Sequence, residues 1–260
     1  MIGMVDYHTH SILSDGKNTY EEMVQVAIEK GLDEIGFSDH ICLQPFDWAI
    51  RMEDIPVMTE QITDLKLKYK DQIAIRYGIE VDYFPDSEKE LKELIETIPV
   101  DYVIGSVHFI GEWNFDSDKS LYGKWTNDQV YHMYFGLIQQ AANSGLFDII
   151  GHLDIIKKFR IYPESNQDKL FEETIKVIKA NNLVVELNTG GINRPCAEYH
   201  PGPKLLEFCY KHHVPLTLTS DAHRAVDIAR HYEGATEMLR KIGYTEITGF
   251  NKKVRRSIRL

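Results

Sequence analysis

The residues of this chain that could carry chemistry are histidines and carboxylates that follow short apolar segments. His8 and His10 stand two apart after one such segment, and Asp221 and His223 stand two apart after another. Residues two apart in an extended strand project to the same face, so each pair presents two converging side chains. Imidazole and carboxylate groups together suit zinc, manganese or iron. The spacing therefore predicts a metal centre.

Other histidines and carboxylates occupy the same kind of position, and together they form the predicted ligand set. Its members are His8, His10, Asp15, His40, Glu80, His108, His152, Asp221 and His223. A lone histidine near a strand end is more often an ordinary hydrogen-bonded residue, but so many coincidences of position and chemistry favour metal ligation. The ordinary interpretation is kept for histidines on predicted helices or at helix ends, namely His132, His212, His213 and His231.

Composition restricts the class of protein. The 260 residues carry a formal net charge of -11, which argues against a chain that coats nucleic acid, although bound cations could reverse the sign locally. The cysteines, at positions 42, 196 and 209, form neither a disulfide framework nor a thiolate zinc site, which is typical of a reducing compartment. The chain starts without a basic-then-apolar leader and has no apolar run of membrane-spanning length. A soluble, unprocessed, cytoplasmic protein is expected.

Segments rich in β-forming residues alternate with amphipathic helical patterns along the whole chain. Seven such segments are expected to be strands, at 4–10, 33–40, 73–83, 101–109, 148–154, 182–191 and 215–223. Their apolar runs suit parallel strands buried on both faces. Helices are predicted between them: Thr19 with Glu22 and Thr126 with Gln129 form capping boxes, and further apolar stripes lie at 91–98, 170–178 and 205–209.

Repeated strand-helix units without a flexible linker predict one α/β domain over residues 1–260, either a barrel or an open doubly wound sheet. Ligands that end nearly every strand can meet at one point only if the strand ends form a ring, which favours a TIM-like barrel. Two stretches, 41–60 and 110–126, are predicted to be long irregular loops that cover the site. The basic end KKVRRSIRL is interpreted as a solvated surface segment.

The order of the motifs resembles that of the polymerase and histidinol phosphatase (PHP) superfamily over essentially the whole chain. The matching residues are HTH at 8–10, Asp15, SDH at 38–40, GIE at 78–80, SVH at 106–108, GH at 151–152 and SDAH at 220–223. The resemblance implies a distorted seven-stranded (β/α)7 barrel with a trinuclear metal site. The length, the NTGGINRP segment and the lack of polymerase or exonuclease parts are most similar to stand-alone histidinol-phosphate phosphatases.

The resemblance also implies how the ligands divide among three divalent ions of zinc, manganese or iron. One ion would be held by His8, His10, Glu80 and Asp221. A second would be held by Glu80, His108 and His152, with Glu80 bridging. The third would be held by Asp15, His40 and His223.

Such a set suits phosphate chemistry. Three divalent ions balanced by three carboxylates leave a formal charge of about +3, or about +2 with a bridging hydroxide, which complements a phosphate dianion. The hypothesis is that bridging hydroxide attacks the phosphorus of a phosphate monoester. Asp15, Asp221 or a metal-bound water is the candidate acid for the leaving alkoxide.

The substrate contacts are predicted from residues beyond the strand ends. Arg160 and Arg194 are expected to make bidentate contacts with phosphate. The alternative for either residue is an ordinary surface arginine, and the location beyond a strand end favours the phosphate contact. An imidazole and an ammonium group would be recognised by carboxylates and aromatic rings, for which the candidates are Asp154, Glu186, Trp48, Phe46 and Trp113. Alternatively, the aromatic rings pack the loops, and Glu186 either caps the barrel interior or orients a ligand with Asn188. Asp154 would then support a ligand from behind, and Asp39 and Asp82 are further candidates for such support.

The predicted function is therefore hydrolysis of L-histidinol phosphate, a small phosphorylated metabolite of histidine biosynthesis. The first alternative is another phosphatase or phosphodiesterase of the same superfamily that acts on nucleotides, oligonucleotide ends or phosphotyrosine. A second alternative is a metal-stabilised module without catalytic activity. No nucleic-acid or membrane partner is expected, and the sequence leaves the oligomeric state open.

Overall fold

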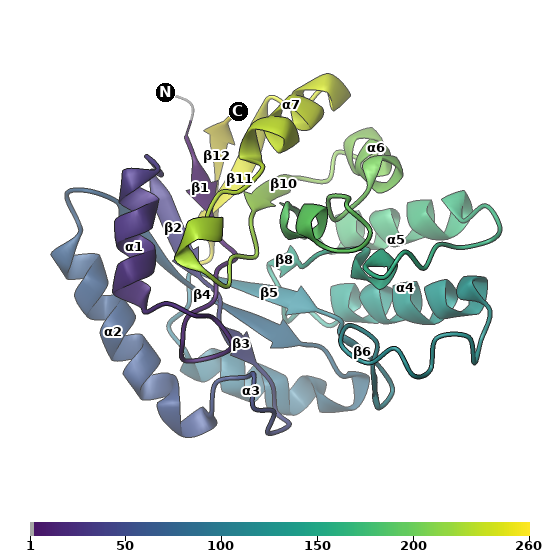
Figure 1. Cartoon of the computed structure of the whole chain (residues 1–260), viewed down its shortest axis with the longest axis horizontal. Helices are drawn as coiled ribbons and strands as arrows, with labels where there is room; N and C mark the ends of the chain where they lie inside the picture. Colours follow the sequence, from purple (N-terminus) through teal and green to yellow (C-terminus); the bar gives the residue numbers. More distant parts are fainter. Residues whose placement is uncertain (1–2) are drawn as a thin grey trace.

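The computed structural model describes residues 3–260 and contains a ring of seven parallel strands surrounded by helices (Figure 1). The strands are β1 (Val5–Asp6), β2 (Glu34–Phe37), β4 (Ala74–Asp82), β5 (Tyr102–Ser106), β8 (Ile149–Ile150), β9 (Val184–Asn188) and β10 (Leu216–Thr219). Neighbours in this order pair in parallel. Each predicted strand segment therefore contains one strand of the ring.

The first and last strands also meet, which makes the ring a nearly closed barrel. Beyond the ends of β1 and β10, Thr9 and Ala222 form a parallel bridge. The His10 amide donates to the Ala222 carbonyl over 2.9 Å, and the Ala222 amide donates to the His8 carbonyl over 3.1 Å. This junction confirms the predicted barrel and excludes the open sheet, and it brings the first and last metal-ligand motifs together.

Helices pack outside the strands, because each presents one apolar stripe to the barrel. The ones predicted from capping boxes and apolar spacing are α1 (Tyr20–Glu29), α3 (Glu88–Thr97), α4 (Asn127–Asn143), α5 (Asp168–Ala180) and α6 (Pro203–Lys211). Both capping boxes are present in the structure. Two more helices, α2 (Ile55–Lys68) and α7 (Tyr232–Ile242), complete the outer layer in Figure 1. Within residues 3–260, no helix combines the length and the apolar character needed to cross a bilayer.

Three segments differ from the prediction. The stretch 41–60 is irregular only in its first part, because a 3-10 turn, η1 (Met52–Asp54), leads into α2. The stretch 110–126 begins within a small hairpin of β6 (Phe109–Ile110) and β7 (Trp113–Asn114). The basic C-terminal segment is a strand, β12 (Val254–Arg259), paired antiparallel with β11 (Glu246–Asn251). Its Ile258 is buried, so this segment is only partly a solvated surface.

Aromatic side chains fill the barrel interior on the side away from the predicted ligands. A Cβ atom on Gly36 would lie 2.2 Å from the Tyr102 hydroxyl oxygen, and one on Gly78 would lie 2.2 Å from the Tyr102 ring, so these two glycines make room for the tyrosine. Tyr7 and Phe250 pack against Tyr102 with ring centroids 5.2 Å and 5.8 Å away. Because this part of the interior is closely packed, a site can form only at the carboxyl ends of the strands.

Candidate metal centre

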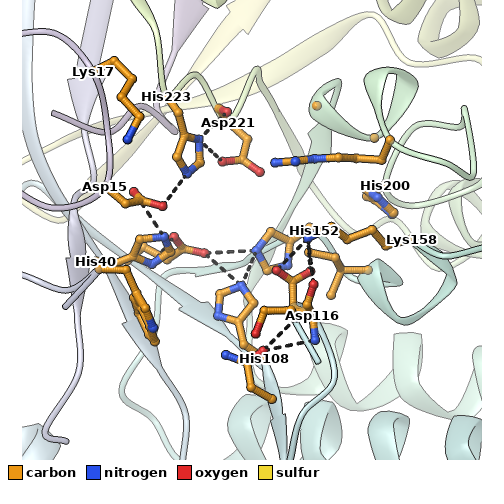
Figure 2. A pocket seen from close by; sticks show the side chains of 18 residues that line it. Asp15, Lys17, His40, His108, Asp116, His152, Lys158, His200, Asp221 and His223 are labelled. Atoms are coloured by element: carbon orange, nitrogen blue, oxygen red, sulfur yellow. Dashed lines mark hydrogen bonds and ion pairs between the residues drawn. The ribbon is translucent and has the colours of Figure 1, made fainter. Parts of the chain in front are cut away.

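The nine predicted ligands converge at the carboxyl ends of the strands. Ligand atoms within 4.8 Å of one another form three groups: His10 with Asp15, His40 and His223; His8 with His10 and Glu80; and Glu80 with His108 and His152. Asp221 lies beside the first two groups, with Oδ1 3.4 Å from His10 Nε2 and 3.8 Å from His8 Nε2. Figure 2 shows the labelled members directed toward one another across one cavity. The structure thus brings together residues that are spread over most of the sequence.

Glu80 lies at the centre of the cluster because of strand register. It is in β4, directly opposite His40 at the start of the short parallel strand β3 (His40–Ile41). Its Oε2 is 3.0 Å from His40 Nδ1 and 3.1 Å from His8 Nε2, and its Oε1 is 3.0 Å from His152 Nε2. A carboxylate with its two oxygens turned to different histidines can bridge two cations.

The outer part of the cluster is built around Asp15 and His223. Asp15 Oδ2 is 3.1 Å from His223 Nε2, and Asp15 Oδ1 is 3.8 Å from His40 Nε2. His10 belongs to this group as well as to the inner one, whereas the family pattern assigned it to the inner ion alone. The His10 ring stacks on the rings of His40 and of His223, with centroids 4.4 Å and 4.3 Å away, and its Nε2 lies 3.6 Å from Glu80 Oε2, so it contacts both groups.

The donor atoms fit metal ions. Buried polar atoms in folded proteins almost always have hydrogen-bond partners. Here a set of buried nitrogen and oxygen atoms has none among residues 3–260, and they belong to His8 Nε2, both nitrogens of His10, Asp15 Oδ1, His40 Nδ1, Glu80 Oε2 and His152 Nδ1. Mixed imidazole and carboxylate donors suit zinc, manganese or iron.

The charges of the cluster interact strongly. Burial and the neighbouring His223 and His40 lower the pKa of His10 to about 4, so its ring is neutral and free to ligate at neutral pH. Burial alone would raise the pKa of Glu80, but the charges of His8 and His40 hold it well below its usual value. Glu80 is therefore ionised, as a ligand must be.

Two carboxylates hold ligand rings from behind. Glu186 was predicted to contact the substrate, but it is fully buried and does not line the cavity. Its Oε2 is 2.8 Å from His8 Nδ1, and its Oε1 accepts the backbone amide of His152. Asp82 Oδ1 is likewise 2.8 Å from His108 Nδ1. Both carboxylates thus contact the far nitrogen of a predicted ligand histidine, which is the geometry expected if they orient ligands.

Asp154, another predicted substrate contact, is also turned into the wall. Its Oδ1 is 2.8 Å from His200 Nδ1, and its Oδ2 accepts hydrogen bonds of 2.8 Å from Gly202 N and Lys157 Nζ. With both oxygens occupied, the carboxylate fixes the His200 ring. His200, in turn, lines the cavity.

The cavity above the ligands has a volume of about 490 Å³. Of the remaining predicted contacts, Arg194 and Trp48 line it, and Trp48 stands edge-on to His40 with centroids 5.0 Å apart. Arg160 does not line it: its side chain is exposed after the turn that follows η3 (Ile155–Lys157).

The other two aromatic candidates pack the loops, as the alternative interpretation held. Phe46 stacks on Trp48 with centroids 5.0 Å apart and lies outside the cavity. Trp113 is buried, and its Nε1 donates to the Asp118 carbonyl over 2.8 Å. Both rings therefore support the walls of the cavity from outside it.

Four ionisable side chains of the cavity were missed from the sequence: Lys17, Asp116, Lys158 and His200. Lys158 Nζ is 2.7 Å from both oxygens of Asp116. All four stand in connections whose course cannot be inferred from strand periodicity. The signal that could have marked them is only their place shortly after predicted strand ends, which many surface residues share.

Fold and side chains together define the class, a parallel β/α barrel with candidate metal-binding groups at the carboxyl ends of its strands. The model of the PHP domain matches residues 6–190. A relative from Deinococcus radiodurans, described as "Probable histidinol-phosphatase", is 31% identical over 261 residues, which cover 98% of this chain and 99% of that protein. The chain belongs to the PHP domain family.

Other relatives agree in length and fold. A histidinol-phosphatase of Lactococcus lactis is 26% identical over 257 residues and covers 95% of this chain and 94% of that protein. The crystal structure of histidinol phosphate phosphatase from the same organism, complexed with zinc, L-histidinol and phosphate, superposes with a TM-score of 0.87 at 23% identity, over 98% of this chain and 100% of the other. This superposition confirms the predicted barrel.

Proposed function

We propose that the protein is a metal-dependent phosphomonoesterase that hydrolyses L-histidinol phosphate to L-histidinol and inorganic phosphate. The observation that carries the proposal is the convergence of nine imidazole and carboxylate side chains in one cavity. The names of the full-length relatives support the choice of substrate. The reaction would supply the alcohol to histidine biosynthesis.

The proposed cofactors are three divalent ions, of zinc, manganese or iron, held by the three groups of ligands. When bound, such ions supply positive charge for the phosphate and lower the pKa of coordinated water. The protein's own contribution is to fix the ligands: Glu186 and Asp82 accept hydrogen bonds from the far nitrogens of His8 and His108 and so keep their near nitrogens free to ligate.

The charges around Asp15 and Asp221 favour ligation over proton donation. Burial alone would raise the pKa of each carboxyl, but the neighbouring histidines hold both below the usual value. A carboxylate that stays ionised is a poor acid at neutral pH. We therefore propose that both residues act as metal ligands and that neither protonates the leaving alkoxide, which leaves a metal-bound water as the candidate acid.

The wall opposite the ligands is proposed to bind the rest of the substrate. Arg194 is exposed, lines the cavity and forms no ion pair within residues 3–260, so it is available to phosphate. Asp116 and Lys158 neutralise each other in the free protein and offer a carboxylate for an ammonium group and a cation for phosphate. Trp48 provides an aromatic face for the imidazole.

The test is release of inorganic phosphate by the purified holoenzyme, with kcat/KM compared across histidinol phosphate, nucleoside monophosphates and a phosphotyrosine peptide. The expected result is a preference for histidinol phosphate of at least about 100-fold, with turnover lost on chelation and restored by one of the three metals. Preference for a nucleotide or for phosphotyrosine would support the alternative phosphatases. Absence of turnover with all substrates, despite a full complement of metal, would support the non-catalytic module.

A cytoplasmic location is part of the proposal. Cys42, Cys196 and Cys209 are all unpaired and buried, which is compatible with a reducing compartment. The proposed partner is the small phosphorylated metabolite itself.

A further inference from the structure

The short connection between β1 and α1 holds one lysine, Lys17, beside the candidate ligands. The connection is tightly tied: Gly16 N donates to the Ser11 carbonyl over 2.9 Å, and Ile12 N donates to the Asn18 carbonyl over 3.0 Å. A Cβ atom on Gly16 would lie 2.2 Å from the His10 carbonyl oxygen, so the chain passes directly over the first ligand motif. The position of Lys17 is therefore set by a rigid backbone.

Lys17 is also tied to the last ligand motif. Its backbone amide donates to the His223 carbonyl over 2.8 Å, and the next residue, Asn18, accepts the Ala225 amide at Oδ1 over 2.9 Å. The side chain lines the cavity, and Figure 2 shows it directed toward Asp15 and His223. In the same view (Figure 2), Lys17 and Lys158 lie on opposite sides of the predicted ligands.

The charge of Lys17 has no partner in the part of the chain that the structure describes. The other lysine of the cavity, Lys158, is neutralised by Asp116 at 2.7 Å, but no carboxylate of residues 3–260 forms an ion pair with Lys17. Asp15, the nearest acid along the chain, is turned to His223 and His40. An ammonium group beside bound divalent cations would be repelled unless an anion lay between them.

We infer that Lys17 binds the phosphate group of the substrate, donating from Nζ to a phosphate oxygen. This inference rests on the proposed phosphatase function and adds a residue that closes the phosphate site from the β1–α1 connection. An ammonium group is a compact point charge with three donors, which suits an oxygen that other groups do not reach.

The experiment compares Lys17→Met and Lys17→Arg with wild type, and uses Lys70→Met as the matched control. Lys70 is exposed, forms no ion pair within the described residues and lies outside the cavity. Two quantities are measured on metal-loaded protein: the Kd of inorganic phosphate by calorimetry, and KM and kcat for histidinol phosphate. Metal content is determined for every variant.

The expected result is that Lys17→Met raises Kd and KM about tenfold, close to 1.4 kcal/mol, with a smaller change in kcat. Lys17→Arg should keep both within about threefold of wild type, and Lys70→Met should change neither. Unchanged Kd and KM in Lys17→Met would overturn the inference, and so would loss of metal from that variant, because Lys17 would then act on the cluster itself. If wild type bound phosphate but did not hydrolyse histidinol phosphate, the proposed substrate would fail while the phosphate titrations would still decide the role of Lys17.

Discussion

Glu186→Gln offers a sharp test of how the ligands are oriented. In the native protein four donors converge on the two carboxylate oxygens: His8 Nδ1 and Thr219 Oγ1 on Oε2, and His152 N and Asn188 Nδ2 on Oε1. A glutamine of the same shape has one accepting oxygen and one donating amide nitrogen. Where the amide nitrogen faces His152 N and Asn188 Nδ2, two donors lose their acceptor; where it faces His8 and Thr219, the hydroxyl of Thr219 can turn to accept, but the hydrogen bond donated by His8 Nδ1 is lost.

Both orientations of the amide harm the site. If the amide nitrogen faces His8, the imidazole can keep a hydrogen bond only by moving its proton to Nε2, the nitrogen that faces Glu80 and would ligate metal. If it faces His152, it meets a backbone N–H that cannot change. Hydrogen bonds to a charged group contribute about 1.5–3 kcal/mol each, so losing both on the His152 side costs about 3–6 kcal/mol before relaxation.

The expected outcome is a 10- to 100-fold loss of metal affinity, the usual effect of removing a group that orients a ligand. Competition with a chromogenic chelator measures the affinity, and thermal unfolding with and without metal measures the stability. Glu34→Gln is the matched control: Glu34 is also buried and accepts hydrogen bonds from Tyr7 and Arg76, but it lies at the amino end of the barrel. That variant should lose stability and keep metal affinity. Equal affinity in Glu186→Gln and wild type, or equal losses in the two variants, would refute the reasoning.

Two further predictions concern the arginines that could contact phosphate and the protonation of the predicted ligand histidines in metal-free protein. Arg194→Met should raise KM for phosphate esters about tenfold, because Arg194 lines the cavity. Arg160→Met should leave kcat/KM within about twofold, because the Arg160 side chain is exposed outside the cavity. Steady-state kinetics measure both variants, and equal effects of the two substitutions would contradict the assignment. Without metal, burial alone would lower the pKa of both His40 and His108, but nearby carboxylates outweigh it. Glu80 chiefly raises the pKa of His40, to about 10, and Asp82 chiefly raises that of His108, to about 9. Protonated rings stabilise the metal-free fold below about pH 6.5, and this contribution is lost as the pH rises toward 9 and 10, so the Tm of metal-free protein should fall over that range while metal affinity rises. A Tm that rose with pH in chelator would contradict this sign.

The strand ends could be predicted from the sequence because two independent signals agree there. Buried parallel strands give continuous apolar runs, and a polar residue at the carboxyl end of such a run has few places to go except the mouth of a barrel. His108 and His152 carry weak signals alone, but each follows a strand that is clear from its apolar residues. The register of β3 against β4, which sets Glu80 beside His40, needed the structure.

The wall of the cavity could not be predicted in the same way. Asp154 and Glu186 both follow or lie in strands near ligands, and the sequence left open whether they face the cavity or the protein. The outcome depends on partners distant in sequence, His200 for the first and His8 for the second. The course of the connections likewise decides that Arg194 reaches the cavity and Arg160 does not.

The strands carry most of the predicted metal ligands and the connections carry the other charged side chains of the cavity, and this separation bears on substrate specificity. Apart from Asp15, which stands in the β1–α1 connection, the predicted ligands stand on or shortly after strands, where backbone hydrogen bonds of the nearly closed barrel hold them. Asp116 and Lys158 stand instead in the connections that follow β7 and η3. Changes at those two positions alter the charge offered to the alcohol without touching a ligand of the metal. Exchanging Asp116 for a neutral residue would also free Lys158, so the cavity would gain positive charge and favour a more anionic phosphate ester. The same set of predicted metal ligands could therefore act on phosphate esters of different alcohols if the residues in these connections changed. For this reason the strand-end residues indicate the class of reaction, whereas the residues of the cavity wall determine the substrate.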